Sequence, residues 1–264
     1  MDPAEDAVIA AEGLRVEADG RALLDGVELR VPAGRMLGLV GPNGAGKTTL
    51  LHTIAGLRRP AGGRVTVEGR AAHDLRPREL ARVIAHVPQE TALAFPFTAY
   101  EVTLMGRHPR LGRFALEGPA DHRAAERAMA ATGTAHLAGR DVTTLSGGER
   151  QLVLLAKALA QDTPVLLADE PVSALDLRHQ LGVLRLLRDR ADAGRTVLVV
   201  LHDLNLAARY CTELALLAGG RLVATGAPAH VLTPAHLDGA YGIRAMVRPD
   251  DLTGSLTVTA LENP

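Results

Sequence analysis

A glycine-rich segment carries the clearest chemistry of the chain. Gly41-Pro42-Asn43-Gly44-Ala45-Gly46-Lys47-Thr48 has the spacing of a P-loop: glycine, four residues, then Gly-Lys-Thr. Its glycines allow backbone N–H groups to curve around a phosphate, and the following helix N-terminus adds partial positive charge. We expect Lys47 to reach the β- and γ-phosphates and Thr48 to hold Mg²⁺. A glycine-rich turn that matches by accident is the alternative, but a strand-like segment before the loop and a helix-like segment after it favour nucleotide binding.

Two carboxylates end a second apolar segment. Asp169 and Glu170 directly follow Val165-Leu166-Leu167-Ala168. In P-loop enzymes an aspartate at such a strand end helps to hold Mg²⁺. Neighbouring side chains of a strand point to opposite sides, so Glu170 can orient and deprotonate a water that attacks the γ-phosphate. Strands often end in acids, and only the P-loop makes this pair informative.

A third segment predicts a helix that starts at an anion. Leu145-Ser146-Gly147-Gly148-Glu149 precedes an apolar helical pattern that runs to about Gln161. Ser146 and Glu149 have capping-box spacing, and a well-capped helix is the simpler interpretation. Each glycine costs about 1 kcal/mol of helix propensity, so we expect something to approach this backbone closely. An anion at the helix N-terminus is the natural candidate.

The segments that must position these residues alternate in type. Strand-like and helical segments follow one another, which predicts an α/β domain with a mainly parallel sheet. A helix is expected over Lys47–Leu57, and strand-like runs give way to alanine-rich helical patterns from about Gln89 to Gln161. The expected strands are Val8–Val16, Val27–Val31, Met36–Val40, Arg64–Val67, Arg82–Val87, Val165–Ala168, Thr196–Leu201, Leu214–Leu217, Leu222–Ala224 and, weakly, Ser255–Ala260.

Composition excludes several classes of protein. The 264 residues are 47% hydrophobic and 22% charged, which argues against a disordered chain. Twenty-nine basic residues oppose thirty acidic ones without a basic stripe, so we expect no nucleic-acid partner. The single cysteine, Cys211, excludes an internal disulfide, and we expect it to be a buried small residue. The acidic N-terminus and short apolar runs predict a soluble chain without a secretory signal or membrane span.

With these motifs in this order, the chain resembles the ATP-binding subunits of ABC transporters. Leu145 to Glu149 matches that family's signature motif, and Val87-Pro88-Gln89 matches its Q-loop. Ser173-Ala174-Leu175-Asp176 matches the D-loop, and His202 matches the switch histidine. The resemblance covers about residues 8 to 245. On its own, His202 would be interpreted as a polar residue at a strand end.

The resemblance implies one ABC ATP-binding domain built on a P-loop NTPase core. The core would comprise about residues 8–88 and 162–245, including an N-terminal antiparallel β subdomain. Residues of about 89–161 would form an inserted helical subdomain, and 246–264 a C-terminal tail.

The resemblance also implies a role for each motif in a head-to-tail dimer of two copies. ATP and Mg²⁺ would lie between the P-loop of one copy and the signature of the other, and Asp176 would help to join the copies. Glu170, His202 and Gln89 would be catalytic, and Thr48, Gln89 and Asp169 would hold the metal. The residues that would contact ATP are Gly41, Pro42, Asn43, Gly44, Ala45, Gly46, Lys47, Thr48 and Thr49, with Ser146, Gly147, Gly148 and Glu149 of the other copy.

Segments outside these motifs resemble one group of importers. Three segments are similar in sequence to ATPases that import iron-siderophores, haem or cobalamin. They are Phe95 to Arg107, Leu201 to Tyr210 and Ala229 to Pro234. This implies a peripheral subunit on the cytoplasmic face of the plasma membrane, with permease subunits and, indirectly, a substrate-binding protein as partners. The alternatives are the ATPase of another importer, an exporter, a regulatory module without hydrolysis, and a soluble ABC protein that acts on ribosomes or DNA. The single P-loop and the lack of a heptad run argue against the last.

Two positions depart from the family pattern, and one generates a prediction. Val172 replaces the usual threonine, with little expected effect on chemistry. Ala18 stands where the family often has an aromatic residue that stacks on adenine. Because such stacking is worth about 1–3 kcal/mol, we predict weak discrimination between ATP and GTP. The ratio of kcat/KM for the two nucleotides tests this, and a strong preference for ATP would contradict it.

Overall fold

The computed structural model describes residues 7–18, 20–89, 95–112 and 115–261. Contacts divide the chain into two compact units, which we describe separately. Unit 1 comprises residues 1–75 and 188–264, and unit 2 comprises residues 76–187. The boundary falls within helix α6 (Leu177–Asp192). None of the helices in the described part of the chain is long and apolar enough to cross a membrane.

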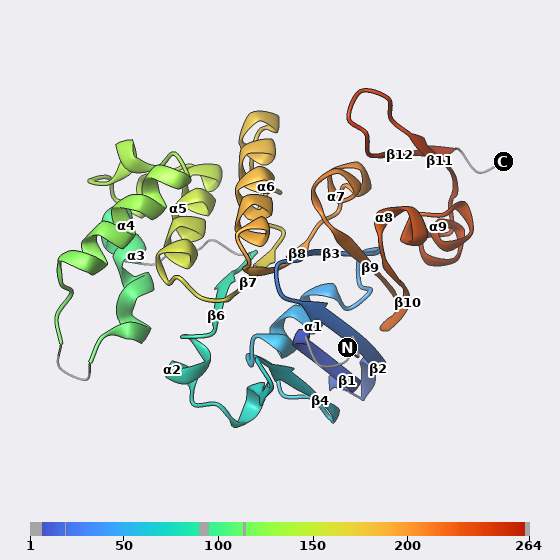
Figure 1. The fold of residues 1–264 in the computed structure, drawn as a ribbon, viewed down its shortest axis with the longest axis horizontal. Helices are drawn as coiled ribbons and strands as arrows, with labels where there is room; N and C mark the ends of the chain where they lie inside the picture. The colour runs from blue at the N-terminus through green and yellow to red at the C-terminus, as the bar shows by residue number, and fades with distance from the viewer. Residues whose placement is uncertain (1–6, 19, 90–94, 113–114, 262–264) are drawn as a thin grey trace. The chain divides into compact units, whose positions relative to one another are not determined.

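Unit 1 begins with an antiparallel sheet of strand order β2-β1-β4-β5. Its strands are β1 (Ala7–Ala18), β2 (Arg21–Pro32), β4 (Gly62–Val67) and β5 (Arg70–Ala71). In Figure 1 the blue strands β1 and β2 lie beside the teal β4. β1 and β2 are longer than the sequence predicts, because register shifts let the ladder continue past polar residues of both strands.

The second strand group of unit 1 carries the P-loop. Here β3 (Met36–Val40) pairs in parallel with β8 (Thr196–Val200) and with β9 (Glu213–Ala218), and β10 (Arg221–Gly226) pairs antiparallel with β9. All residues of β3 and β8 are buried, which explains their unbroken apolar runs. After the P-loop comes α1 (Lys47–Ile54), three residues shorter than predicted; the backbone N–H groups of residues 55–58 donate to its last carbonyls in turns that end the helix.

The remainder of unit 1 lies after β8. It comprises α7 (Leu204–Tyr210), α8 (Pro228–Val231), α9 (Pro234–Tyr241) and the hairpin of β11 (Arg244–Pro249) and β12 (Leu256–Leu261), with η1 (Ala72–Asp74) from earlier in the chain. The weak strand prediction for Ser255–Ala260 is therefore confirmed within one residue. Cys211 is buried, as predicted, and burial raises the pKa of its thiol to about 12.

Unit 2 contains a parallel pair of strands and a group of helices. β6 (Ile84–Val87) pairs with β7 (Val165–Asp169), and α2 (Pro77–Leu80) precedes them. Between the two strands the described residues form helices and one isolated bridge. These are α3 (Ala99–Leu104), η2 (Met105–Arg110), α4 (Pro119–Ala131), η3 (Ala135–Leu137), η4 (Val142–Thr144) and α5 (Gly147–Ala160). Helices α3, α4 and α5 pack side by side (Figure 1).

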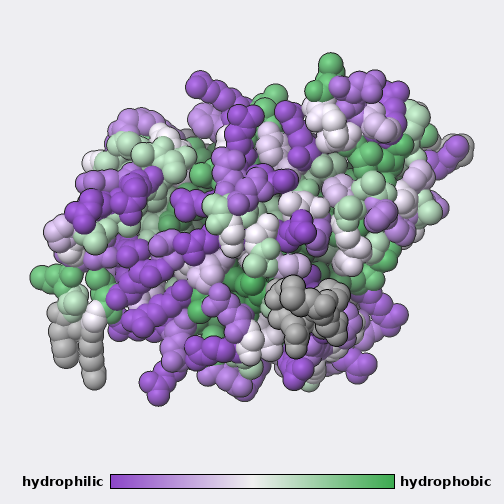
Figure 2. Space-filling view, viewed as in Figure 1, coloured by the Kyte–Doolittle hydropathy of each residue, from purple (hydrophilic) through white to green (hydrophobic). Residues whose placement is uncertain are grey.

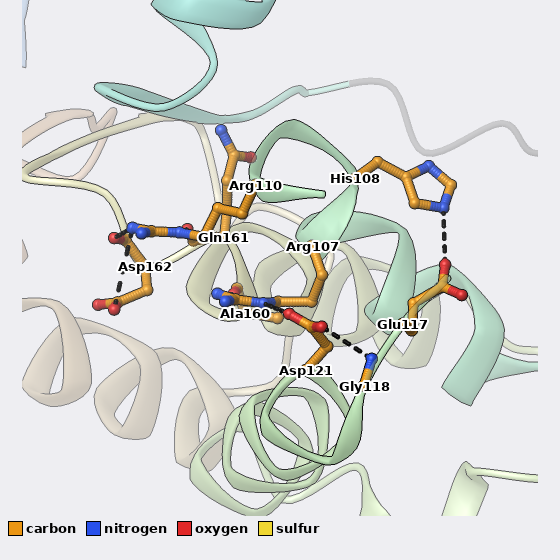
Figure 3. Close-up of polar contacts among 9 residues, drawn as sticks. All are labelled: Arg107, His108, Arg110, Glu117, Gly118, Asp121, Ala160, Gln161 and Asp162. Atoms are coloured by element: carbon orange, nitrogen blue, oxygen red, sulfur yellow. Dashed lines mark hydrogen bonds and ion pairs between the residues drawn. The ribbon is translucent and has the colours of Figure 1, made fainter. Parts of the chain in front are cut away.

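Side chains of η2 hold the C-terminal end of α5 (Figure 3). Arg107 donates to the Ala160 carbonyl at 2.7 Å and to Asp121 of α4 at 2.9 Å. Arg110 donates to the carbonyls of Gln161 and Asp162. Cationic side chains at a helix C-terminus satisfy its last carbonyls and complement its dipole. A Cβ at Gly106 would overlap the Lys157 carbonyl oxygen, so only glycine allows η2 to approach α5 this closely.

Apolar side chains are concentrated in the interior. Hydrophilic side chains cover much of the face seen in Figure 2. Among the residues that the structure describes, the large apolar side chains that remain exposed are Leu57, Phe95, Phe97, Leu116, Leu177, Val223, Met246, Leu252 and Leu261.

The position of Asp121 predicts a pH-dependent contribution to stability. The Gly118 backbone N–H, and then Arg107, lower the pKa of Asp121 from its usual 3.8. The stabilisation is therefore complete above the unfolded pKa and is lost as the pH falls through the lower folded pKa. We expect Asp121→Asn to reduce the free energy of unfolding at neutral pH by about 1 kcal/mol, measured by urea unfolding.

The exposed pair of Arg188 and Asp192 supplies the control for this prediction. Its atoms are 2.9 Å apart, but the Asp192 side chain is 56% exposed, compared with 15% for Asp121. Asp192→Asn should therefore change stability little. An equal loss in both variants, or a loss from Asp121→Asn that remains undiminished once the pH is well below the lowered folded pKa of Asp121, would contradict the assignment.

Candidate functional site

The predicted P-loop lies between β3 and α1, as its sequence requires. Gly41, Gly44 and Gly46 have positive φ values of 148°, 76° and 103°. A Cβ at Gly41 would overlap the carbonyl oxygen of Leu217 in β9, whereas a Cβ at Gly44 would meet open space. Gly41 is therefore required by close packing, and Gly44 by backbone conformation alone.

Lys47 is folded into the loop. Its ammonium donates to the Gly41 carbonyl at 2.7 Å and to the Pro42 carbonyl at 2.9 Å, and the residue is buried. Behind the loop, the Gly220 N–H donates to the Ala45 carbonyl at 3.1 Å. The loop thus holds a cation on two of its own carbonyls, beside the backbone amides that a phosphate would bind.

Tyr241, at the end of α9, is a residue that the motifs do not predict. The nearby Gly41 backbone N–H lowers the pKa of its hydroxyl, which opposes the larger effect of burial. Burial raises the pKa of Tyr241 to about 12, so the hydroxyl stays protonated at neutral pH. Tyr241 lies 200 residues from the P-loop in sequence. Its position just before Gly242, which ends α9 in the left-handed conformation, is the only sequence signal that could have pointed to it.

His202 lies in unit 1 at the end of the strand next to β3. Val200 pairs with Leu39, and the Leu201 N–H donates to the Leu39 carbonyl at 3.2 Å. Because β3 and β8 are parallel, both the P-loop and His202 follow carboxyl ends of neighbouring strands. The His202 side chain is exposed there.

Unit 2 brings together Gln89 and Glu170. The Gln89 amide donates to a Glu170 carboxylate oxygen at 3.0 Å, because Gln89 follows β6 and Glu170 follows the paired strand β7. Glu170 has a φ of 48°, an uncommon conformation for a residue with a side chain. The Ser173 hydroxyl and N–H both donate to its carbonyl, at 3.0 and 3.2 Å. Asp169, at the end of β7, is fully buried.

The signature segment starts α5 with the predicted capping box. The Glu149 N–H donates to the Ser146 hydroxyl at 3.2 Å, and the Ser146 N–H donates to the Glu149 carboxylate at 2.8 Å. Hydrogen bonds to its carboxylate from the Ser146 backbone N–H, and then from the Ser146 side chain, lower the pKa of Glu149. A Cβ at Gly148 would lie 3.0 Å from the Ala174 carbonyl oxygen, whereas a Cβ at Gly147 would meet nothing within 4 Å.

The two signature glycines are therefore required for different reasons. We expected an anion to approach both, but at Gly148 the close neighbour is the chain's own backbone. Only Gly147 faces open space.

Asp176 accepts from the His179 N–H at 2.9 Å and from the His179 ring at 2.8 Å, at the start of α6. Bonds from His179 lower the pKa of Asp176.

The donor chemistry of the site residues suits a nucleotide bound with magnesium. Mg²⁺ prefers oxygen ligands, and each unit carries side-chain oxygens of this kind, Thr48 in unit 1 and Gln89 and Asp169 in unit 2. The P-loop offers backbone amides, a helix N-terminus and Lys47 to phosphate oxygens. Together these features define a P-loop nucleotide-binding protein of the α/β class.

Comparisons with known proteins refine this class to a family. The family model described as "ABC transporter" matches residues 24–173. The hemin import ATP-binding protein HmuV of Streptomyces coelicolor is 49% identical over 259 residues, covering 98% of this chain and 92% of the relative. The chain belongs to the ABC transporter family. Its resemblance to ATP-binding subunits and its P-loop fold, both predicted from sequence, are confirmed.

Other relatives and solved structures agree on the fold. The cobalamin import ATP-binding protein BtuD of Halobacterium salinarum is 50% identical over 94% of this chain, which spans 62% of that relative's length. A metal-chelate type ABC transporter in an inward-facing conformation matches with a TM-score of 0.83 and 28% identity, over 97% of this chain and 98% of the other. An ATP-binding cassette dimer bound to ADP and Pi matches with a TM-score of 0.74 and 28% identity, over 83% of this chain and 98% of the other.

The Tyr241 hydroxyl beside Gly41 generates a prediction about nucleotide affinity. Tyr241→Phe removes this polar group from beside the Gly41 N–H and loosens the start of the P-loop. We expect the Kd for MgATP to rise about 3- to 10-fold in equilibrium binding. Tyr210→Phe, which removes a hydroxyl elsewhere in unit 1, is the control and should bind as the wild type does. Equal affinity of the two variants would show that the Tyr241 hydroxyl does not support binding.

Proposed function

We propose that this chain is the ATP-hydrolysing subunit that powers import of an iron-siderophore, haem or cobalamin through a membrane ABC transporter complex. The observation that carries the ATPase proposal is the pairing of Gln89 with Glu170 in a chain that also has an intact P-loop. A regulatory module without hydrolysis has no need of a carboxylate held at the end of β7. The names of the cobalamin and hemin import relatives support the choice of cargo class.

In the proposed reaction, the P-loop binds the triphosphate of ATP and Lys47 leaves the Gly41 and Pro42 carbonyls for phosphate oxygens. Bound Mg²⁺ would supply charge neutralisation at the β- and γ-phosphates, with Thr48, Gln89 and Asp169 as its side-chain ligands. Glu170 accepts a proton from the attacking water, and Gln89 orients its carboxylate. His202 contacts the γ-phosphate.

We further propose that two copies act head to tail. The signature residues Ser146, Gly147, Gly148 and Glu149 would contact the ATP held by the partner's P-loop, and Asp176 would contact the other copy. The open space at Gly147 supports this, because it leaves room for a group from outside the chain. A dimeric ABC transporter cassette is among the similar structures, with a TM-score of 0.75.

The proposed membrane partners are permease subunits, with a substrate-binding protein acting through them, at the cytoplasmic face of the membrane. In the proposed division of the chain, residues 8–88 and 162–245 form the nucleotide-binding core, 89–161 the helical subdomain, and 246–264 the tail.

Phe95 and Phe97, which are 67% and 43% exposed, pack edge to face at 6.4 Å between ring centres. An exposed aromatic pair is unusual in a chain with 2% aromatic residues and supports a partner surface here.

Glu170→Gln tests the proposed chemistry. The substitution keeps the size of the side chain and removes the base, so we expect ATP hydrolysis to fall at least about 100-fold. ATP-bound dimers should accumulate, measured by size-exclusion chromatography with ATP and Mg²⁺. Glu126→Gln, on the exposed face of α4, is the control and should hydrolyse ATP normally. Normal turnover by Glu170→Gln would remove Glu170 from the role of base.

Uptake in a strain that lacks this protein tests the cargo class. Labelled ferric siderophore, haem and cobalamin are supplied separately, and the strain is complemented with wild type or Glu170→Gln. Loss of one cargo, restored only by the wild type, would identify the substrate. Uptake of all three at the normal rate in the deletion strain would remove the proposed cargo class and leave the ATPase proposal to the hydrolysis assay.

A further inference from the structure

Two hydrogen bonds connect the C-terminal hairpin to α7. The Val258 N–H donates to the Asn205 side-chain oxygen at 2.7 Å, and the Asn205 amide donates to the Val258 carbonyl at 3.4 Å. One side chain thus binds both backbone polar groups of one residue in β12. Figure 1 shows β12 beside α7, in agreement with the packing between these elements.

Asn205 lies three residues after His202, in the first turn of α7. The Asp203 carboxylate accepts from the N–H groups of Asn205 and Leu206, at 2.8 and 3.0 Å, and caps the helix. On the other side of His202, Leu201 is bonded to Leu39 of β3. The backbone of His202 therefore lies between the hydrogen-bonded end of a buried strand and the capped first turn of α7.

The hairpin is itself well defined. β11 and β12 pair without a register shift from Arg244–Leu261 to Pro249–Leu256. Asp250 organises its turn, accepting from the Leu252 N–H at 3.0 Å and from the Thr253 hydroxyl at 2.7 Å. β11 also packs against α9. A two-stranded hairpin is marginally stable alone, so the contacts with α7 and α9 stabilise this one within unit 1.

We propose that Asn205 is a positioning residue for ATP hydrolysis, through which the C-terminal hairpin fixes the turn that carries His202. The inference rests on the proposed role of His202 at the γ-phosphate. Neither Asn205 nor Val258 contacts the nucleotide in this scheme. Their bonds restrict α7, whose capped first turn sets the direction in which the His202 ring leaves the backbone.

The proposal makes a kinetic distinction. The P-loop binds ATP in the ground state, whereas His202 acts where charge develops during hydrolysis. Loosening the His202 turn should therefore lower kcat and leave KM nearly unchanged. A general loss of structure in unit 1 would instead raise KM, because the P-loop belongs to the same unit.

Two variants cut the connection from opposite sides. Asn205→Ala removes both hydrogen bonds from the helix side. Val258→Pro removes the outward N–H of β12, a position at which an edge strand tolerates proline. Thr259→Ala is the control, because this residue is the exposed neighbour of Val258 on the same strand. Each variant is made in the full-length wild type and again with His202→Ala.

The measurements are steady-state and single-turnover ATP hydrolysis and the melting temperature. We expect kcat to fall about 3- to 10-fold in Asn205→Ala and in Val258→Pro, with KM within about twofold and the double variant no worse than either. Thr259→Ala should behave as the wild type does. With His202→Ala, neither substitution should lower the rate further, since residues that act as a unit are not additive.

Opposite outcomes separate this inference from the proposed function. Wild-type kcat in Asn205→Ala, or an equal loss with and without His202, would overturn the positioning role and leave the ATPase proposal intact. Normal hydrolysis by His202→Ala would overturn the role of His202 and this inference with it. Absence of hydrolysis in the wild type would overturn both proposals.

Discussion

The packing of Gly41 against β9 is the constraint on which the nucleotide site depends. The Leu217 carbonyl occupies the space that a side chain at Gly41 would need. This contact places the start of the P-loop directly on a buried parallel strand pair, where β3 pairs with β9 as far as Val40. The Gly41 carbonyl then accepts a hydrogen bond from Lys47, and the Gly41 N–H lies beside the Tyr241 hydroxyl. A phosphate would compete for Lys47 but not for Tyr241, so the loop keeps one anchor when its lysine is engaged.

Helix α5 is likewise held in place by a few contacts at each of its two ends. Its N-terminus carries the capping box of Ser146 and Glu149, and Gly148 packs on the Ala174 carbonyl. Its C-terminus receives Arg107 and Arg110 from η2. The signature segment is therefore positioned by a helix whose far end is bonded to the segment that follows Phe95 and Phe97. In the proposed transporter, a movement of the partner surface would reach the signature through this one helix.

The sequence predicts the motifs well because each is continuous and its physics is local. The P-loop, the capping box at Ser146 and the two acids at the end of β7 all depend on spacing within a few residues. Gln89 and Glu170 are also predictable as a pair, since both follow parallel strands. Tyr241 and Asn205 are different: their partners, Gly41 and Val258, are 200 and 53 residues away in sequence. Nothing local marks such residues, because the contact exists only after the strands and helices have packed.

Glu170 shows why the chemistry of this site needs the surrounding fold. A non-glycine residue with a φ of 48° costs about 1–3 kcal/mol and persists only when its neighbours enforce it. Here β7 is buried along its whole length before the bend, and Ser173 binds the Glu170 carbonyl after it. The bend turns the carboxylate out of the line of β7 and toward Gln89. Because the Asp169 side chain is fully buried while Glu170 is not, two adjacent acids have distinct surroundings. In the proposed reaction, that difference would allow the neighbouring carboxylates to divide metal binding and proton acceptance between them.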